Sequence, residues 1–230
     1  MKQNKFLILF FMLLFCGIIS EAQSKKESTS AKSGIQQDSS YTDITKPQKS
    51  ITQGSVTVEG TRINYQAVAG PLILKNNDNK PTCSMFYTAY FKSDINDVSK
   101  RPVTFIYNGG PGYSTMLLHI AAWGPQCVYL NDTFRVRASY KTINNDNSLL
   151  DASDLVFIDA PGTGFSQIID KERGGAGDPK EFYGIDEDAH VFATFISQFL
   201  SDYSRWNSPK YLFGESYGTF RSAVVANILE

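Results

Sequence analysis

Three short apolar runs mark the chain, at residues 103–107, 155–158 and 211–213. A glycine-containing loop follows each of them. Short continuous apolar runs are typical of strands that are buried on both faces of a parallel sheet. The pattern therefore predicts that these runs form strands at the centre of a sheet.

The spacing of apolar residues around these runs predicts helices. Residues 186–203 carry apolar side chains at helical intervals and acidic side chains in the first turn, which indicates an amphipathic helix. Residues 116–122 are expected to form another helix. Strands that alternate with helices are typical of an α/β sheet.

The preceding part of the chain shows the alternation of antiparallel strands. Apolar residues at every second position flank Glu59-Gly60, and they are Val56, Val58, Ile63 and Tyr65. This predicts a β-hairpin at the start of the sheet. Residues 67–74 extend the hairpin with an interruption at Gly70-Pro71, and residues 85–91 are expected to form a further strand.

The amino terminus predicts export. Lys2 and Lys5 precede an apolar run over residues 6–19, and small residues up to Ala22 follow it. This is the pattern of a secretory signal peptide over residues 1–22, and the run is too short to span a membrane comfortably. We expect cleavage near Ala22, a periplasmic or extracellular location, and no membrane span in the mature chain. Residues 23–50 are polar and predict a flexible spacer, which leaves residues 51–230 for a folded domain.

Composition narrows the class of protein. The 230 residues are 42% hydrophobic with a net charge of −1, which excludes disorder of the whole chain and gives no support to nucleic-acid binding. The chain has no dinucleotide fingerprint, phosphate loop or His-Cys metal spacing, so we expect no cofactor and no metal. Cys83 and Cys127 remain after export, and the sequence leaves open both their pairing and the oligomeric state.

Residues 214–218 carry the candidate chemistry. They read Gly-Glu-Ser-Tyr-Gly, which fits the Gly-x-Ser-x-Gly pattern of a nucleophile elbow. In an elbow a serine lies on a tight turn between a strand and a helix, and flanking glycines allow the two elements to approach. The apolar run before Ser216 and the apolar residues 219–229 after it suit this context. An ordinary glycine-rich turn is the alternative.

The loops after the three apolar runs resemble those of one family. They are Asn-Gly-Gly-Pro-Gly at residues 108–112, Asp-Ala-Pro-Gly-Thr-Gly-Phe-Ser at residues 159–166, and the motif at residues 214–218. Their order and spacing are similar to those of the serine carboxypeptidases, a branch of the α/β-hydrolase superfamily, from about Gln53 onwards. Residues 123–125 and 205–211 match as well, and the chain looks most like the N-terminal portion of the bacterial exported members. The resemblance implies an incomplete α/β-hydrolase fold, the N-terminal half of a mostly parallel sheet flanked by helices.

The resemblance also implies residue roles. Ser216 would be the acylated nucleophile, and the backbone N–H groups of Gly110 and Tyr217 would form the oxyanion hole. The groups that bind the terminal carboxylate of a peptide substrate would be Asn108, Gly109 and Glu215. Glu215 must be protonated for this task, because two carboxylates repel each other. We therefore expect better peptidase activity at acidic pH.

The catalytic triad is incomplete in this sequence. In the family an Asp and then a His follow the serine, whereas His119 and His190 both precede Ser216. We assign neither as the base; His119 is expected to be solvated or to cap a helix, and His190 to be structural. Asp159 also precedes the serine and is expected to anchor a loop. We therefore expect the chain as given to be inactive alone.

Two other interpretations stay open. The vacuolar members of the family carry a second glutamate at the position of Ala122, so an esterase or acyltransferase on the same scaffold is one alternative. The other is a truncated, non-catalytic remnant. A sheet that stopped at residues 211–213 would leave an unpaired strand edge.

Overall fold

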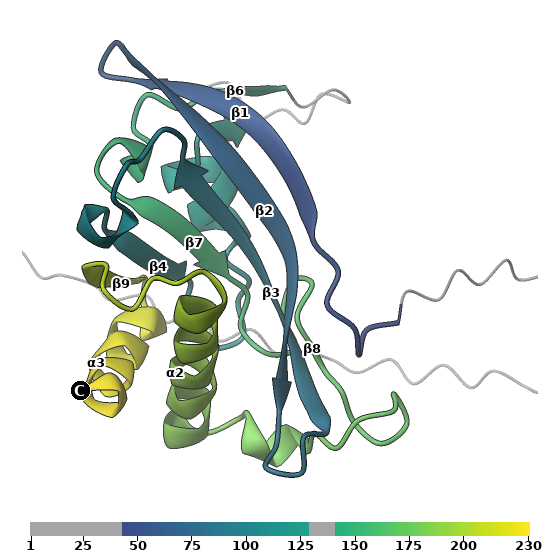
Figure 1. The fold of residues 1–230 in the computed structure, drawn as a ribbon. Coiled ribbons are helices and arrows are strands. Elements are labelled where there is room, and N and C mark those ends of the chain that lie inside the picture. Colours follow the sequence, from purple (N-terminus) through teal and green to yellow (C-terminus); the bar gives the residue numbers. More distant parts are fainter. Residues whose placement is uncertain (1–42, 129–140) are drawn as a thin grey trace, which may run out of the picture. The chain divides into compact units, whose positions relative to one another are not determined.

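The computed structural model describes residues 43–128 and 141–230 (Figure 1). The predicted signal peptide and most of the predicted spacer lie outside these residues. The strands are β1 (Ser50–Val58), β2 (Thr61–Lys75), β3 (Pro81–Lys92), β4 (Val103–Tyr107), β5 (Gln126–Val128), β6 (Thr142–Asn144), β7 (Asp154–Ile158), β8 (Gln167–Ile168) and β9 (Lys210–Gly214). The helices are α1 (Met116–Leu118), α2 (Ile185–Asp202), α3 (Tyr217–Leu229), the π-helix η2 (His119–Trp123), and the 3₁₀ turns η1 (Val98–Lys100), η3 (Leu149–Asp151) and η4 (Pro179–Glu181). None of the helices in these two ranges is long and apolar enough to cross a membrane.

The main sheet is mixed. Its strands lie in the order β1-β2-β3-β7-β4-β9, and β8 pairs with β3. Neighbours from β1 to β7 are antiparallel, whereas β4 is parallel to both β7 and β9. The predicted α/β class, with an antiparallel hairpin at its start, is confirmed. Because β4, β7 and β9 run in the same direction, the loops that follow them leave the sheet at one edge.

The hairpin between β1 and β2 forms as the sequence predicts. Glu59 and Gly60 at its turn both have positive φ angles, of 47° and 77°, which matches the twist of antiparallel strands. The interruption predicted at Gly70-Pro71 is wrong, because β2 continues through both residues. The pairing with β1 ends at Ala69, so Pro71 has only β3 beside it. A strand with one free edge can hold a residue that lacks an N–H group.

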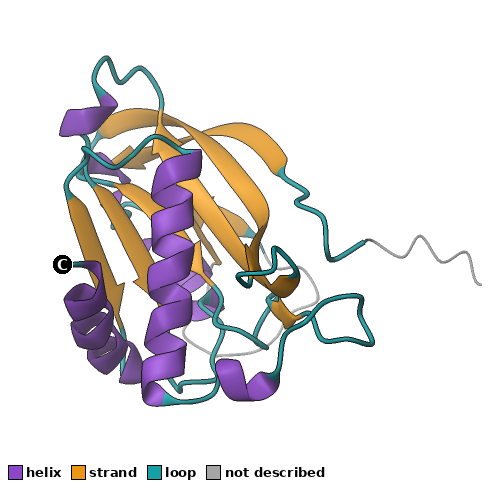
Figure 2. Cartoon of the chain, turned by 60° about the horizontal axis from the view of Figure 1, so that its bottom comes forward, coloured by secondary structure: helices purple, strands orange, loops and turns teal. Residues whose placement is uncertain are grey.

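Both faces of the central strands are covered. Alternate side chains point to opposite faces of a sheet. Phe105 and Tyr107 pack in one core with α2 and α3, whereas Ile106 packs in a second core with the β1–β2 hairpin and Trp123. Figure 2 shows α2 and α3 side by side over the first face. A strand covered on both faces has no polar side, which explains why β4 and β7 are apolar.

The third apolar run differs from the other two. Among the described strands, β9 pairs with β4 alone. Tyr211 is 57% exposed. The strand itself is confirmed, but the prediction that both its faces are buried is wrong for the described residues. Burial of a strand depends on its neighbours, and the described residues place no element beyond β9.

A buried cluster of charges lies at the start of the parallel strands. Asp154 begins β7, and its carboxylate is 3.2 Å from Nε of Arg101 and 2.5 Å from Nη1 of Arg205. Arg205 also donates to the backbone oxygen of Arg101, at 2.7 Å. Arg205 belongs to the connection between α2 and β9. The cluster therefore holds that connection against the amino ends of β4 and β7.

The two described cysteines do not form a disulfide. Both are free thiols, Cys83 in β3 and Cys127 in β5 of the separate two-stranded sheet. Burial raises the pKa of the Cys83 thiol to about 12. The pairing that the sequence leaves open is absent from this structure.

Candidate active site

Ser216 lies on a sharp turn between β9 and α3. Its φ of 55° and ψ of −125° are unusual for a residue with a side chain, and such a conformation costs about 1 to 3 kcal/mol. The side chain of Ser216 is exposed. The strand–turn–helix context predicted for this motif is therefore present, with the serine at its strained point.

The motif's glycines allow backbone segments to touch. A Cβ atom at Gly214 would overlap the backbone oxygen of Gly218 one turn later. A Cβ at Gly218 would lie only 3.0 Å from the backbone oxygen of Tyr107, at the end of β4. The glycines at both positions thus let α3 start directly against β9 and β4.

The loop after β4 packs against the same turn. A Cβ at Gly109 would lie 2.5 Å from the nitrogen of Tyr217, 2.6 Å from the oxygen of Glu215 and 2.8 Å from the nitrogen of Gly218. Tyr217 is the first residue of α3, so its N–H group has no acceptor within the helix. Gly110, the other predicted oxyanion donor, directly follows Gly109 at a φ of 108°. The two predicted donors thus belong to backbone segments that are in contact.

The predicted carboxylate-binding residues also come together. Nδ2 of Asn108 donates a hydrogen bond to Oε2 of Glu215, at 2.9 Å. Asn108 is buried and Glu215 is exposed. Oδ1 of Asn108 is buried without a hydrogen-bond partner in the described part of the chain. A buried amide with a free oxygen beside an exposed carboxyl forms a polar corner next to Ser216.

Thr115 and Asp159 support this corner from behind. The backbone nitrogen of Asn108 donates to Oγ1 of Thr115, at 3.3 Å. The two carboxylate oxygens of Asp159 accept from the nitrogens of Thr115, at 2.8 Å, and Phe165, at 3.2 Å. Burial raises the pKa of Asp159, and these two hydrogen bonds oppose the shift. Asp159 thus anchors the loop after β7 to the loop after β4, the task that the sequence predicts for it.

Neither histidine lies at Ser216. Nε2 of His119 is 2.7 Å from the hydroxyl of Tyr90, and the ring stacks on Phe157 with centroids 4.6 Å apart. Burial lowers the pKa of His119 to about 4. The predicted solvated or capping position is wrong, because the half-buried ring of His119 packs between Tyr90 and Phe157. His190 lies on the exposed side of α2, with Nδ1 2.7 Å from the backbone oxygen of Asp186.

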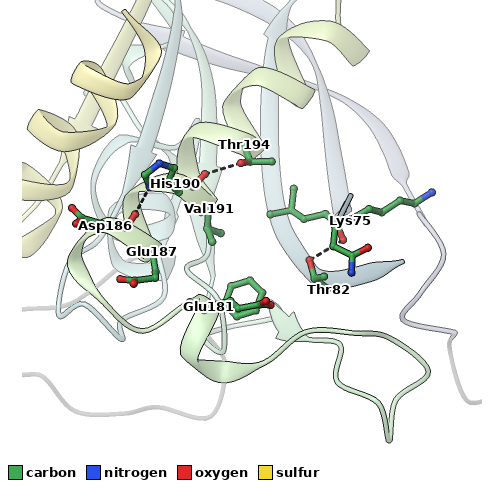
Figure 3. Close-up of a pocket in the computed structure, with 11 residues that line it drawn as sticks. Lys75, Thr82, Glu181, Asp186, Glu187, His190, Val191 and Thr194 are labelled. Atoms are coloured by element: carbon green, nitrogen blue, oxygen red, sulfur yellow. Dashed lines mark hydrogen bonds between the residues drawn. The ribbon is translucent and has the colours of Figure 1, made fainter. Parts of the chain in front are cut away.

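A separate pocket lies at the start of α2 (Figure 3). It encloses about 470 Å³, and its lining includes Glu181, Glu187 and His190. In Figure 3 the ring of His190 is hydrogen-bonded to the backbone oxygen of Asp186 in the same helix. None of the predicted site residues lines this pocket. It therefore contributes nothing to the chemistry of Ser216.

Sequence reasoning missed two supporting groups. Thr115, at the centre of the network behind Asn108, sits in an ordinary polar segment without a motif. Arg221 is the other, and it had a signal, because it is the one charged residue in the mostly apolar helix α3. A lone charge in a helix that packs on a sheet indicates a buried ion pair.

The family model and two similar proteins that match this chain are all described as carboxypeptidases. A family model described as serine carboxypeptidase matches residues 20–230. The serine carboxypeptidase S10 family member 1 of Dictyostelium discoideum is 29% identical over 143 residues, which is 61% of this chain and 30% of that protein. The pheromone-processing carboxypeptidase KEX1 of Saccharomyces cerevisiae is 32% identical over 143 residues, or 60% of this chain and 18% of that protein.

A solved structure has a similar fold. The crystal structure of the prohormone-processing carboxypeptidase KEX1 from Saccharomyces cerevisiae matches with a TM-score of 0.56 and 28% sequence identity. The match covers 71% of this chain and 34% of that one. The chain thus spans about a third or less of the length of these relatives.

Proposed function

The chain belongs to the serine carboxypeptidase family, and from this premise we propose that it carries the nucleophile of an exported enzyme that removes residues from peptide C-termini. The strained, exposed turn at Ser216 beside the Asn108–Glu215 pair carries this proposal. A serine held at an elbow presents its hydroxyl for attack on a carbonyl. An amide and a carboxyl beside it provide a place for a terminal carboxylate. The predicted signal peptide supports export.

The proposed reaction proceeds through an acyl-enzyme. Oγ of Ser216 attacks the last peptide carbonyl while a general base takes its proton. The N–H groups of Gly110 and Tyr217 stabilise the negative oxygen of the tetrahedral intermediate. The C–N bond then breaks, and the amine leaves with the proton. Water attacks the ester, returns the hydroxyl to Ser216 and releases the shortened peptide.

The terminal carboxylate supplies the specificity. In the proposal it binds between Asn108, Gly109 and Glu215, with the carboxyl of Glu215 protonated so that it donates rather than repels. Asn108 is held in place by its own bond to Glu215. This arrangement favours exopeptidase cleavage, because a peptide bond inside a chain offers no carboxylate at that distance.

The triad base and acid are proposed to come from sequence other than these 230 residues. His119 packs against Tyr90 and Phe157, and His190 faces the exposed side of α2, which supports a base from elsewhere. The relatives are much longer than this chain, which leaves them room for both groups. A serine without its base is a weak nucleophile.

The test uses the complete natural protein that contains these residues. Two peptides of one sequence, with a free and with an amidated C-terminus, are compared for release of the last residue. The proposal expects release from the free peptide, strongly reduced release from the amide, and none after Ser216→Ala. Ser201→Ala, at an exposed serine of α2, is the matched control and should keep full activity. Equal cleavage of both peptides, or cleavage that survives Ser216→Ala, would contradict the proposal.

Ala122 favours a second candidate, an esterase or acyltransferase on the same scaffold. Its methyl group cannot add an acid to the carboxylate corner, and its backbone oxygen is already bonded to Asn145, at 2.7 Å. With a smaller acid network, recognition of a free carboxylate is weaker. Activity of the same protein on acyl esters but not on free peptides would favour this candidate.

A further inference from the structure

Arg221 is a fully buried cation in the wall of the candidate site. It is 1% exposed and lies in the first turns of α3, shortly after Ser216. Asp188 of α2 binds it in a bidentate pair, with Nε 2.6 Å from Oδ2 and Nη2 2.9 Å from Oδ1. The aromatic ring of Phe192 lies 4.2 Å from the guanidinium carbon. The proposed chemistry does not use this cation.

The same guanidinium reaches the loop after β4. Nη1 donates to the backbone oxygen of Asn108, at 2.6 Å, and Nη2 reaches the oxygen of Pro111, at 3.4 Å. These two carbonyl groups stand on either side of Gly109 and Gly110. The planar guanidinium of Arg221 therefore connects α2, α3 and the loop at residues 108–112.

We propose that Arg221, oriented by Asp188, is a positioning residue that fixes the backbone of Gly109 and Gly110 against the elbow. The inference rests on the proposed function, because the N–H group of Gly110 is assigned there to the oxyanion hole. Neither glycine has a side chain to hold it in place, so the loop needs contacts from outside. Donors in a fixed fork are a property of arginine that lysine lacks.

The proposed positioning role and a purely structural role predict different effects on catalytic rate and on stability. An oxyanion donor acts only in the transition state, and a shift of about 1 Å in such a group costs on the order of 100-fold in rate. Loss of a buried ion pair alone lowers stability without changing the rate of the molecules that remain folded. Catalytic rate and thermal stability therefore distinguish a positioning residue from a structural one.

Arg221→Lys in the complete natural protein is the main test. We expect kcat for release of the C-terminal residue to fall by about 10- to 100-fold. A peptide aldehyde, which forms a tetrahedral oxyanion on Ser216, should lose affinity by a similar factor. The corresponding peptide acid, which forms no oxyanion, should change by less than about threefold on the same reasoning.

Arg205→Lys is the matched control. Arg205 is also buried and bound to an aspartate, but it lies at the opposite ends of the strands from Ser216. Both variants should lower the Tm. Only Arg221→Lys should lower kcat and aldehyde affinity per folded molecule. Equal kcat values in the two variants would overturn the inference.

Amide hydrogen exchange gives a readout that needs no activity. The nitrogen of Tyr113 donates to the backbone oxygen of Gly109, at 3.1 Å, so its exchange rate reports on the shape of the loop. We expect faster exchange at Tyr113 in Arg221→Lys and no change in Arg205→Lys. If Arg221→Lys does not fold, Asp188→Asn is measured instead, because it frees the guanidinium from its partner on α2 without changing any residue of the loop, and faster exchange at Tyr113 is again expected.

These readouts keep two failures apart. If the unaltered natural protein releases no C-terminal residue, the proposed function fails, and Tyr113 exchange still decides whether Arg221 holds the loop. If that protein is active while Arg221→Lys keeps both its kcat and its Tyr113 exchange rate, the function stands and the positioning role is wrong.

Discussion

At the scale of single residues, backbone strain at Ser216 gives a prediction that separates function from stability. A positive φ suits glycine far better than a residue with a Cβ. We expect Ser216→Gly to be more stable than Ser216→Ala by about 1 kcal/mol in urea unfolding. Both variants lack the hydroxyl and should be inactive. Equal stability of the two would show that the turn is not strained.

The proposed role of Glu215 in binding the substrate's carboxylate gives a prediction for the pH dependence of activity. A protonated carboxyl donates to the substrate's carboxylate, and an ionised one repels it. We expect kcat/KM for a free peptide to fall from acidic to neutral pH, with KM carrying most of the change. Glu215→Gln donates at every pH and should flatten this profile. An ester substrate without a carboxylate is the control, and the account fails if its profile matches that of the peptide.

His119 determines part of the pH dependence of stability. Its folded pKa of about 4 lies below the ordinary value of 6.5, so the unfolded chain binds the proton more tightly. Stability is then unaffected above pH 6.5 and is lost as the pH falls towards 4, by roughly 2 to 3 kcal/mol. His119→Gln should remove this loss, as measured by urea unfolding across that range. His190→Gln, at an exposed position, should leave it unchanged, and an equal effect of both changes would contradict this.

At the scale of secondary-structure elements, the buried charges at the start of β7 connect three segments. Asp154→Asn leaves Arg101 and Arg205 as buried cations without their counter-ion. We expect the free energy of unfolding to fall by about 3 to 5 kcal/mol. Asp97→Asn breaks an exposed pair with Lys100 and should have no measurable effect in the same denaturation assay. If Asp154→Asn lowered the free energy of unfolding as little as Asp97→Asn, water would have to reach the charges around Asp154.

The elements that the sequence predicts correctly are those with a local signal. Apolar runs identify β4 and β7, and apolar spacing identifies α2. The wrong predictions concern residues whose burial or strand membership depends on neighbouring elements rather than on local sequence. β9 has the composition of a buried strand but, among the described strands, only β4 as a neighbour. Pro71 fits a strand because β1 has already ended. His119 has a polar side chain, but its position between Tyr90 and Phe157 follows from the way η2 packs.

At the scale of the whole molecule, the sheet gathers the candidate site from distant segments. Glycine-rich motifs identify Asn108, Ser216 and Asp159, and parallel strands bring their loops to one edge. The hydrogen bonds that hold these loops in place are not predictable from the motifs. Contacts of Arg221 with Asp188 and with the oxygen of Pro111 join segments far apart in the chain. No motif encodes such contacts, because they depend on how helices pack over the sheet.

The absence of a base near Ser216 among the described residues gives a prediction for the chain of 230 residues. We expect negligible hydrolysis of a free peptide by this chain purified alone. The complete natural protein, assayed at the same concentration, should hydrolyse the same peptide. Robust hydrolysis by the 230 residues, abolished by Ser216→Ala, would mean that a base within them activates the serine.

The most direct test of the account is to locate the acylated residue. The complete natural protein is treated with a fluorophosphonate, which reacts with activated serines, and the adduct is mapped by mass spectrometry. The account predicts one phosphonyl group on Ser216 and a loss of C-terminal cleavage in proportion to its extent. Complete inhibition with the adduct on another residue, or full labelling of Ser216 with activity intact, would contradict it.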